Sequence, residues 1–250
     1  MNGNIGAVIV AAGLSSRMGA YKPLIEIGGV TVARRVIDAF SEAGVSPIVV
    51  VTGHRRDELE SHLSMRGAGD ADEGDDRGRT GVGDDAVDDY GTETVRGDRR
   101  KGELLFVRNK DYATTSMYDS AKIGLLSIMG RCERVFFCPV DVPLFTAGTV
   151  RRLMESDAPV VKPAYKGEEG HPILIDAKLI PAITGLGRTC GATPKTTSGE
   201  PRAVEGEGGL RAALAPFKKV TEIISVEDEG VLYDADTPDD IKKLSAILKP

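Results

Sequence analysis

Two apolar segments that enclose one amphipathic segment constrain the fold of this chain more than any other feature. The apolar segments, 5–10 and 47–52, are short and rich in β-branched residues. Between them Thr31 stands where a helix N-cap belongs, and Val32 and Phe40 lie on one face of the helix that follows. A strand, a helix and a second strand in this order are typical of a right-handed βαβ unit with strands buried on both faces.

The same alternation continues along the rest of the chain. Further strands are predicted at 104–107, 135–138, 159–162, 172–175 and 220–226, and further helices at 116–129, at 149–154 and from Pro238 onward. This order predicts an α/β fold of three α/β/α layers, doubly wound around a mostly parallel, Rossmann-like sheet. One domain accommodates the 250 residues.

Two segments lack apolar periodicity and are predicted to be insertions. Residues 66–100 are rich in Gly and Asp and are predicted to be a disordered acidic insertion, whereas 185–203 is predicted to be a second loop insertion. The first holds 11 of the 38 acidic and 6 of the 32 basic residues, so the remainder has a net charge of −1. A near-neutral body does not repel an anionic nucleotide. We interpret the acidic segment as a tolerated surface loop rather than an interaction tail.

Composition excludes several classes of protein. A net charge of −6, an aromatic share of 5% and the absence of Trp argue against nucleic-acid binding. The three cysteines form no C-x-x-C pair, which favours a reducing compartment over a disulfide framework or a zinc site. Neither a signal-peptide pattern nor an apolar stretch of bilayer-spanning length is found. The expected location is therefore the cytoplasm, with no membrane contact.

The segment after the first strand carries the clearest chemical motif. Ala11, Ala12 and Gly13 are small enough to let backbone N–H groups approach a ligand, while Arg17 and Lys22 supply cationic donors for phosphate oxygens. The segment is neither a Walker A loop nor a G-x-G-x-x-G dinucleotide turn. It resembles the signature loop of the MobA-like nucleotidyltransferases, which include the molybdenum cofactor cytidylyltransferases and guanylyltransferases.

This resemblance implies a Mg²⁺-dependent enzyme that transfers a nucleoside monophosphate from an NTP to a phosphorylated acceptor such as molybdopterin and releases pyrophosphate. The guanylyl-transferring branch has Gly-Gly where this chain has Ala12-Gly13. The expected nucleotide is therefore CTP. A molybdoenzyme is then a candidate recipient of the product.

Three aspartates are the predicted metal ligands. Asp141 follows a buried strand, and the carboxyl ends of parallel strands are where open α/β sheets bind ligands. The alternative is that Asp141 caps the next helix. Asp234 and Asp236 lie on one face if their segment is extended, so either can share a cation with Asp141. The resemblance implies the same metal role for Asp141 and a second contact from Asp234 or Asp236.

The predicted acceptor side rests on two motifs similar to those of the cytidylyltransferases. His171 lies in a Gly-His-Pro sequence, and Arg211 ends a Gly-rich sequence. A structural histidine and a solvated arginine are equally good interpretations. Asn109 and Ser116 resemble a substrate segment more loosely, and a helix N-cap is the better interpretation for Ser116.

The predicted reaction needs neither a nucleophile nor a general base from the protein. In-line attack on the α-phosphorus would be promoted by positioning and charge neutralisation, so the predicted catalytic residues are Arg17, Lys22 and Asp141. Rival interpretations are a sugar-phosphate or phosphocholine acceptor, and a non-catalytic protein that holds the molybdenum cofactor. A dinucleotide-dependent oxidoreductase is disfavoured because its glycine fingerprint is absent.

Overall fold

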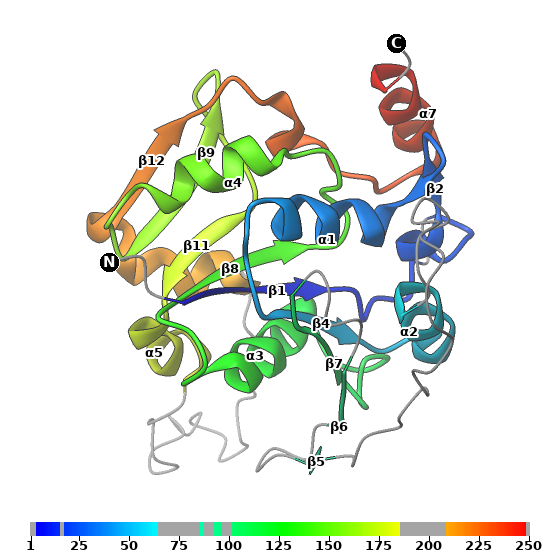
Figure 1. Cartoon of the computed structure of the whole chain (residues 1–250), viewed down its shortest axis with the longest axis horizontal. Coiled ribbons are helices and arrows are strands. Elements are labelled where there is room, and N and C mark those ends of the chain that lie inside the picture. The colour runs from blue at the N-terminus through cyan, green and yellow to red at the C-terminus, as the bar shows by residue number, and fades with distance from the viewer. Residues whose placement is uncertain are drawn as a thin grey trace, which may run out of the picture.

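A computed structural model describes residues 4–15, 18–64, 86–87, 93–96, 102–185 and 209–248. Its centre is four parallel strands in the order β8 (Arg134–Pro139), β1 (Ile5–Val10), β4 (Ile48–Thr52) and β7 (Leu104–Arg108), seen in Figure 1. All six residues of β1 are buried, because helices cover both faces of the sheet. The predicted α/β fold with a mostly parallel sheet is confirmed.

Antiparallel strands flank this parallel centre. Beside β8 lies β11 (Ile173–Asp176), followed by β9 (Val160–Tyr165), which forms a hairpin with β10 (Glu168–Glu169). β12 (Thr221–Ser225) pairs in parallel with β9. At the other end, β6 (Glu93–Arg96) pairs with β7, and β5 (Ala86–Val87) pairs with β6.

The strands β5 and β6 correct part of the prediction for 66–100. Disorder was expected throughout that segment, yet both strands belong to the main sheet. The backbone of β7 leaves hydrogen-bonding groups at its outer edge, and β6 pairs with them even though its surroundings are polar. The rest of 66–100 and residues 186–203 lie outside the described residues.

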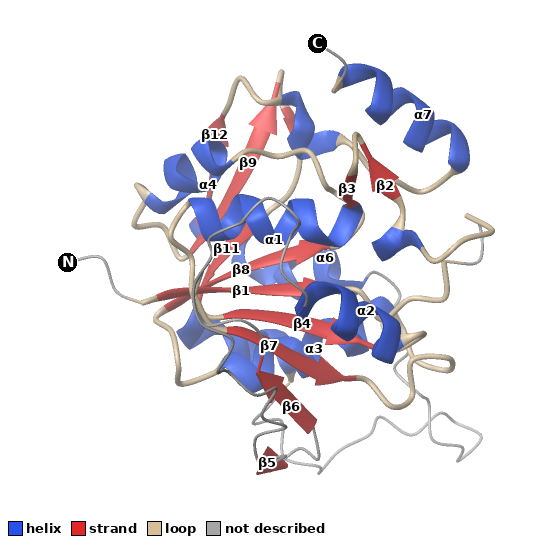
Figure 2. Ribbon diagram, turned by 45° about the vertical axis from the view of Figure 1, so that its right-hand side comes forward, coloured by secondary structure: helices blue, strands red, loops and turns tan. Residues whose placement is uncertain are grey.

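Helices lie on both faces of the sheet in Figure 2, and a hydrophobic core fills the space between the sheet and each layer of helices. Side chains alternate across a strand, so Ala7 and Ile9 of β1 enter one core while Val8 and Val10 enter the other. The first core contains residues of α1 (Val32–Glu42), α2 (Arg56–Ser64), α4 (Ala147–Met154) and α7 (Pro238–Ile247). The second contains residues of α3 (Met117–Ile128), α5 (Ile180–Thr184) and α6 (Gly209–Leu214).

Short elements connect these layers near the end of β1. The 3₁₀ turn η1 (Lys22–Leu24) precedes a hairpin of β2 (Glu26–Ile27) and β3 (Val30–Thr31). Thr31 precedes α1 as predicted, but its hydroxyl makes no capping hydrogen bond. That hydroxyl instead lies 3.1 Å from Nε2 of His62 in α2, so it ties two helices together.

Three further 3₁₀ turns complete the described elements: η2 (Ala177–Leu179), η3 (Ala215–Val220) and η4 (Glu229–Leu232). In the part of the chain that the structure describes, no helix has both the length and the apolar character needed to cross a bilayer.

Candidate active site

A cavity of about 210 Å³ opens at the carboxyl ends of β1 and β8. The loop after β1, the start of α3 and the segment that precedes α7 meet around this cavity. Its lining includes Ala11, Ala12, Gly13, Ser15, Lys22, Tyr112, Thr115, Ser116, Asp141 and Asp236. Four of the five residues predicted to bind nucleotide thus line one cavity. The fifth, Arg17, lies outside the described residues, and its role stays a prediction.

The loop after β1 is shaped for a close backbone approach to a ligand. Ala11 and Ala12 are buried, whereas a Cβ added at Gly13 would meet no atom within 4 Å. Ser15 has a φ of +55°, and its Oγ accepts a hydrogen bond of 3.0 Å from the backbone N–H of Lys22. This hydrogen bond closes the loop and fixes the start of η1, from which the Lys22 side chain extends into the cavity.

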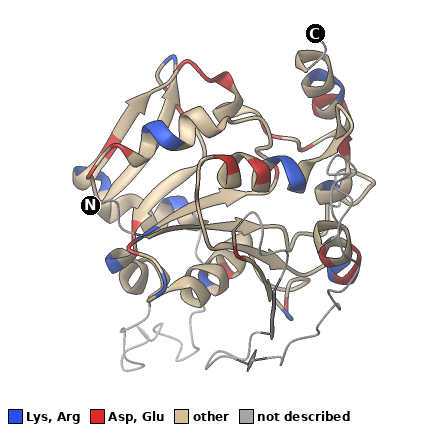
Figure 3. Cartoon of the chain, viewed as in Figure 1, with Lys and Arg blue, Asp and Glu red and all other residues tan. Residues whose placement is uncertain are grey.

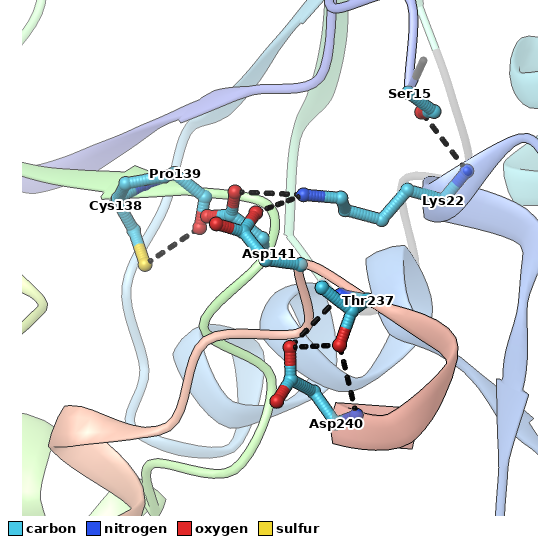
Figure 4. Close-up of polar contacts among 8 residues, drawn as sticks. Ser15, Lys22, Cys138, Pro139, Asp141, Thr237 and Asp240 are labelled. Carbon is cyan, nitrogen blue, oxygen red and sulfur yellow. Dashed lines mark hydrogen bonds and ion pairs between the residues drawn. The ribbon is translucent and has the colours of Figure 1, made fainter. Parts of the chain in front are cut away.

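Lys22 joins two of the predicted metal ligands, as Figure 4 shows. Its Nζ lies 3.2 Å from Oδ2 of Asp141 and 2.6 Å from Oδ1 of Asp236. Burial lowers the pKa of Lys22, but hydrogen bonds to Asp236 and Asp141 and the charges of both outweigh it and raise the pKa above its usual value. Lys22 is therefore a permanent cation between two carboxylates, a contact that its predicted role as a phosphate donor did not include.

The segment of Asp234 and Asp236 is anchored by the residue between them. Ala235 is fully buried, and its N–H donates to the backbone oxygen of Asp141 at 2.7 Å. The two aspartates therefore flank a residue that faces the core. Burial, with repulsion from Asp141 and Asp236, raises the pKa of Asp234 to about 6. Lys22 thus contacts two carboxylates, and the charge of a third, Asp234, lies close enough to be felt by them.

The acidic cluster has the chemistry of a site for a hard cation. Carboxylate oxygens are preferred ligands of Mg²⁺, which in nucleotide-binding sites needs one or two carboxylates and completes its coordination with water and phosphate. Among the described residues, no three acidic, His or Cys side chains converge closely enough to hold a metal alone. Asp141 and Asp236, which already share a cation, fit the requirement for two, so the metal roles of these aspartates stay a prediction.

The helix N-caps decide whether Asp141 and Ser116 have capping roles. The helix after Asp141 is α4, and its N-cap is Thr146, so Asp141 does not cap it. Thr237 and Asp240 form a capping box at the start of α7, and Ser116 and Asp119 form another at α3. The predicted capping role of Ser116 is confirmed.

A second cavity of about 660 Å³ adjoins the first, since Met117 and Pro139 line both. His171 and Arg211 both line it, although 40 residues separate them in the sequence. The Nδ1 atom of His171 is buried with no hydrogen-bond partner. Burial lowers the pKa of His171 to about 4, so the ring is neutral at pH 7 and can donate or accept at this wall.

Sequence reasoning missed a close contact between two loops beside the first cavity. A Cβ on Gly53 would lie 2.7 Å from the backbone oxygen of Ala12 and 2.7 Å from Cβ of Tyr112, so only glycine allows these loops to meet. Asn109, which the sequence placed loosely in a substrate segment, uses its side-chain amide within the protein: it donates to Thr115 and Ser120 at 2.9 Å and accepts from the backbone N–H of Asp111 at 3.0 Å. The Gly after the second strand was the available signal for this close approach.

Comparison with known proteins identifies the family. The MobA-like NTP transferase domain matches residues 7–79 and 85–198. The chain belongs to this family. The molybdenum cofactor cytidylyltransferase of Escherichia coli K12 is 24% identical over 94% of this chain and 93% of that protein.

Solved structures agree with the fold. A nucleotidyl transferase from Methanothermobacter thermautotrophicus has a TM-score of 0.65 and 22% identity, covering 97% of this chain and 96% of its own. A Mycobacterium tuberculosis protein solved in complex with manganese has a TM-score of 0.60 and 15% identity, covering 97% and 98%. These structures show the α/β fold, and membership of the MobA-like NTP transferase family makes the chain a nucleotidyltransferase.

Proposed function

We propose that this protein transfers CMP from CTP to a phosphorylated acceptor of the molybdopterin class and releases pyrophosphate. The observation that carries the proposal is the adjacency of two cavities, one with the small-residue loop, Lys22 and Asp141, the other with His171 and Arg211. A nucleotide in the first and an acceptor in the second would meet at their shared wall, where Met117 and Pro139 lie.

In this proposal the first cavity holds the nucleotide. Ala11, Ala12 and Gly13 would offer backbone N–H groups to the nucleotide, and Lys22 and Arg17 would neutralise phosphate charge. Ala12 is the basis for CTP, because it stands where the guanylyl-transferring branch has Gly. The 24% identity to a curated cytidylyltransferase supports the same choice.

Mg²⁺ is the proposed cofactor, held by Asp141 and Asp236 with Asp234 beside them. When bound, the ion would supply a Lewis acid that neutralises the phosphates. The manganese complex of a structural neighbour supports a divalent cation in this fold. The Lys22 ammonium would then exchange a carboxylate partner for a phosphate oxygen, which keeps its own positive charge compensated.

The second cavity is the proposed acceptor site. Arg211 would bind the acceptor phosphate and His171 would hydrogen-bond its ring system through the unsatisfied Nδ1. The phosphate of the acceptor is then the nucleophile, and its ionised form needs no general base from the protein at pH 7. A molybdoenzyme that accepts the cytidylylated product is the proposed downstream partner.

Pyrophosphate release tests the proposal. The protein with Mg²⁺ is incubated with CTP or GTP at equal concentration and with molybdopterin, a sugar phosphate or phosphocholine in turn. We expect release with CTP and molybdopterin together and with no other pair. A preference for GTP would refute the cytosine assignment, release with a sugar phosphate or phosphocholine would refute the pterin acceptor, and the absence of release with every pair would refute catalysis.

A further inference from the structure

The strand β12 has an outer edge that no described element pairs with. From Thr221 to Ser225 it pairs with β9, and it pairs with no other described strand. It lies at the margin of the molecule, away from the helix α7 (Figure 1). A strand edge of this kind presents N–H and C=O groups that can pair with another strand.

The pairing with β9 determines which backbone groups point outward. The N–H of Val226 donates to the backbone oxygen of Ala164 at 2.9 Å. Backbone groups of successive residues point to opposite sides of a strand, so the even-numbered residues of β12 face β9. Thr221, Ile223 and Ser225 therefore direct their N–H and C=O groups away from the sheet.

The side chains along this edge are apolar at the centre and oppositely charged at the ends. Ile223 at the centre of β12 is 52% exposed, and Val220, the last residue of η3, is 44% exposed. Lys218 and Lys219 precede the strand, Glu227 follows it, and all three are exposed. Figure 3 shows basic residues at one end of β12 and acidic residues at the other.

This arrangement is complementary to itself. In the proposed arrangement, a second copy of β12 lies antiparallel to the first, with a two-fold axis at Ile223. A residue that precedes Ile223 by a given number of positions then faces the residue of the copy that follows Ile223 by the same number. Ile223 then meets its own copy, Thr221 meets Ser225, and all outward backbone groups pair in one hydrogen-bonded ladder. The end of β12 that follows Lys218 and Lys219 of η3 then lies beside the Glu227 end of the copy, and two-fold symmetry makes this contact of opposite charges twice. A parallel arrangement would instead place lysine against lysine.

We propose that the protein forms a two-fold homodimer in which the β12 strands of two copies pair antiparallel, centred on Ile223. Centring on Ile223 is the register in which the outward groups of all three residues, 221, 223 and 225, are paired, and the charges at the strand ends oppose a slip of two residues. The dimer extends the sheet through both copies and brings the exposed Ile223 side chains of the two copies together. Residues of β12 line neither cavity of the active site.

Charge reversal tests the interface. Sedimentation equilibrium of the full chain is expected to give a dimer. Lys219→Glu and Glu227→Lys should each weaken it about tenfold, since two symmetric pairs change from attraction to repulsion, whereas the double variant should restore it. Ile247→Lys, at an equally exposed position in α7, is the matched control and should leave the dimer unchanged. A chain that is monomeric at every concentration refutes the proposal, and so does a dimer that the charge reversals leave unchanged.

Disulfide trapping tests the register independently. Residues directly opposite in a hydrogen-bonded pair have Cα atoms about 5.5 Å apart, which a disulfide spans. Ile223→Cys should therefore cross-link to its own copy under mild oxidation, whereas Ser225→Cys, four residues from its copy along the ladder, should not. The unsubstituted chain, with its own three cysteines, sets the background. A dimer that persists in Ile223→Lys, or cross-linking equal in both cysteine variants, overturns the assigned interface.

Discussion

Replacing Asp141 by Asn separates catalysis from folding at the acidic cluster. Asn keeps the shape of the side chain and an oxygen that can accept from Lys22, while it removes the charge that a divalent cation requires. Lys22 also keeps Asp236 at 2.6 Å, so its ammonium is not left without a counterion. The backbone oxygen of Asp141 that accepts from Ala235 is unaffected by the substitution.

The expected effects differ in size because of these remaining contacts. Weakening one charged hydrogen bond costs about 1 kcal/mol, part of which is offset because Asp234 loses a repelling neighbour. For a chain of this length the melting temperature should fall by about 2–4 °C. Turnover should fall about 100- to 1000-fold, as when one group that stabilises transition-state charge is removed.

Three measurements on the purified protein decide the matter: melting without ligand, pyrophosphate release, and Mg²⁺-dependent binding of CTP. Asp239→Asn is the matched control, because Asp239 is 77% exposed and pairs with Lys242 on α7. It should behave as the unsubstituted chain. Near-normal turnover of Asp141→Asn would refute the metal role. A collapse in stability with normal binding of the metal and nucleotide by the folded fraction would assign Asp141 to the fold instead.

Three further perturbations follow from the geometry. His171 takes a proton near pH 6.5 when unfolded but only at about 4 when folded, so the unfolded state binds more protons in this range. The free energy of unfolding should therefore fall by about 3 kcal/mol as the pH falls from 6.5 to 4, and His171→Asn should remove this component from the pH dependence measured by urea unfolding. The same pH dependence in the variant and the unsubstituted chain would contradict this reasoning. Gly53→Ala should cost about 1–3 kcal/mol and weaken CTP binding, because the new Cβ would meet Ala12 and Tyr112 at 2.7 Å, whereas Gly148→Ala in α4 serves as a control; an unchanged melting temperature would show that the loops can separate. Deleting 66–84 with a Gly/Ser linker should leave melting and turnover unchanged, but deleting 66–100 should lower the melting temperature, since it also uncovers the edge of β7; identical behaviour of the two would show that β6 contributes nothing.

The sequence by itself determined the layers of this fold. Runs such as 5–10 and 48–52 have no polar face, so they can only be central strands of a sheet covered on both sides. The helices between them carry one apolar face each, and the expected cap at Ser116 and the expected start at Pro238 mark two helix starts correctly. These signals are local, because periodicity and capping involve residues within a few positions of one another.

Only the tertiary structure decided how the candidate site is assembled. Lys22, Asp141 and Asp236 come from three distant segments, and nothing in the spacing of the chain indicates that the lysine ammonium lies between the two carboxylates. The contact exists because the ends of β1 and β8 are neighbours in the sheet and Ala235 is hydrogen-bonded to the backbone beside them. The pairing of β6 with β7 has the same origin. Strand order and the exposure of strand edges depend on which segments meet in space. Contacts between segments that are distant in the chain leave no periodic pattern in the sequence from which they could be predicted.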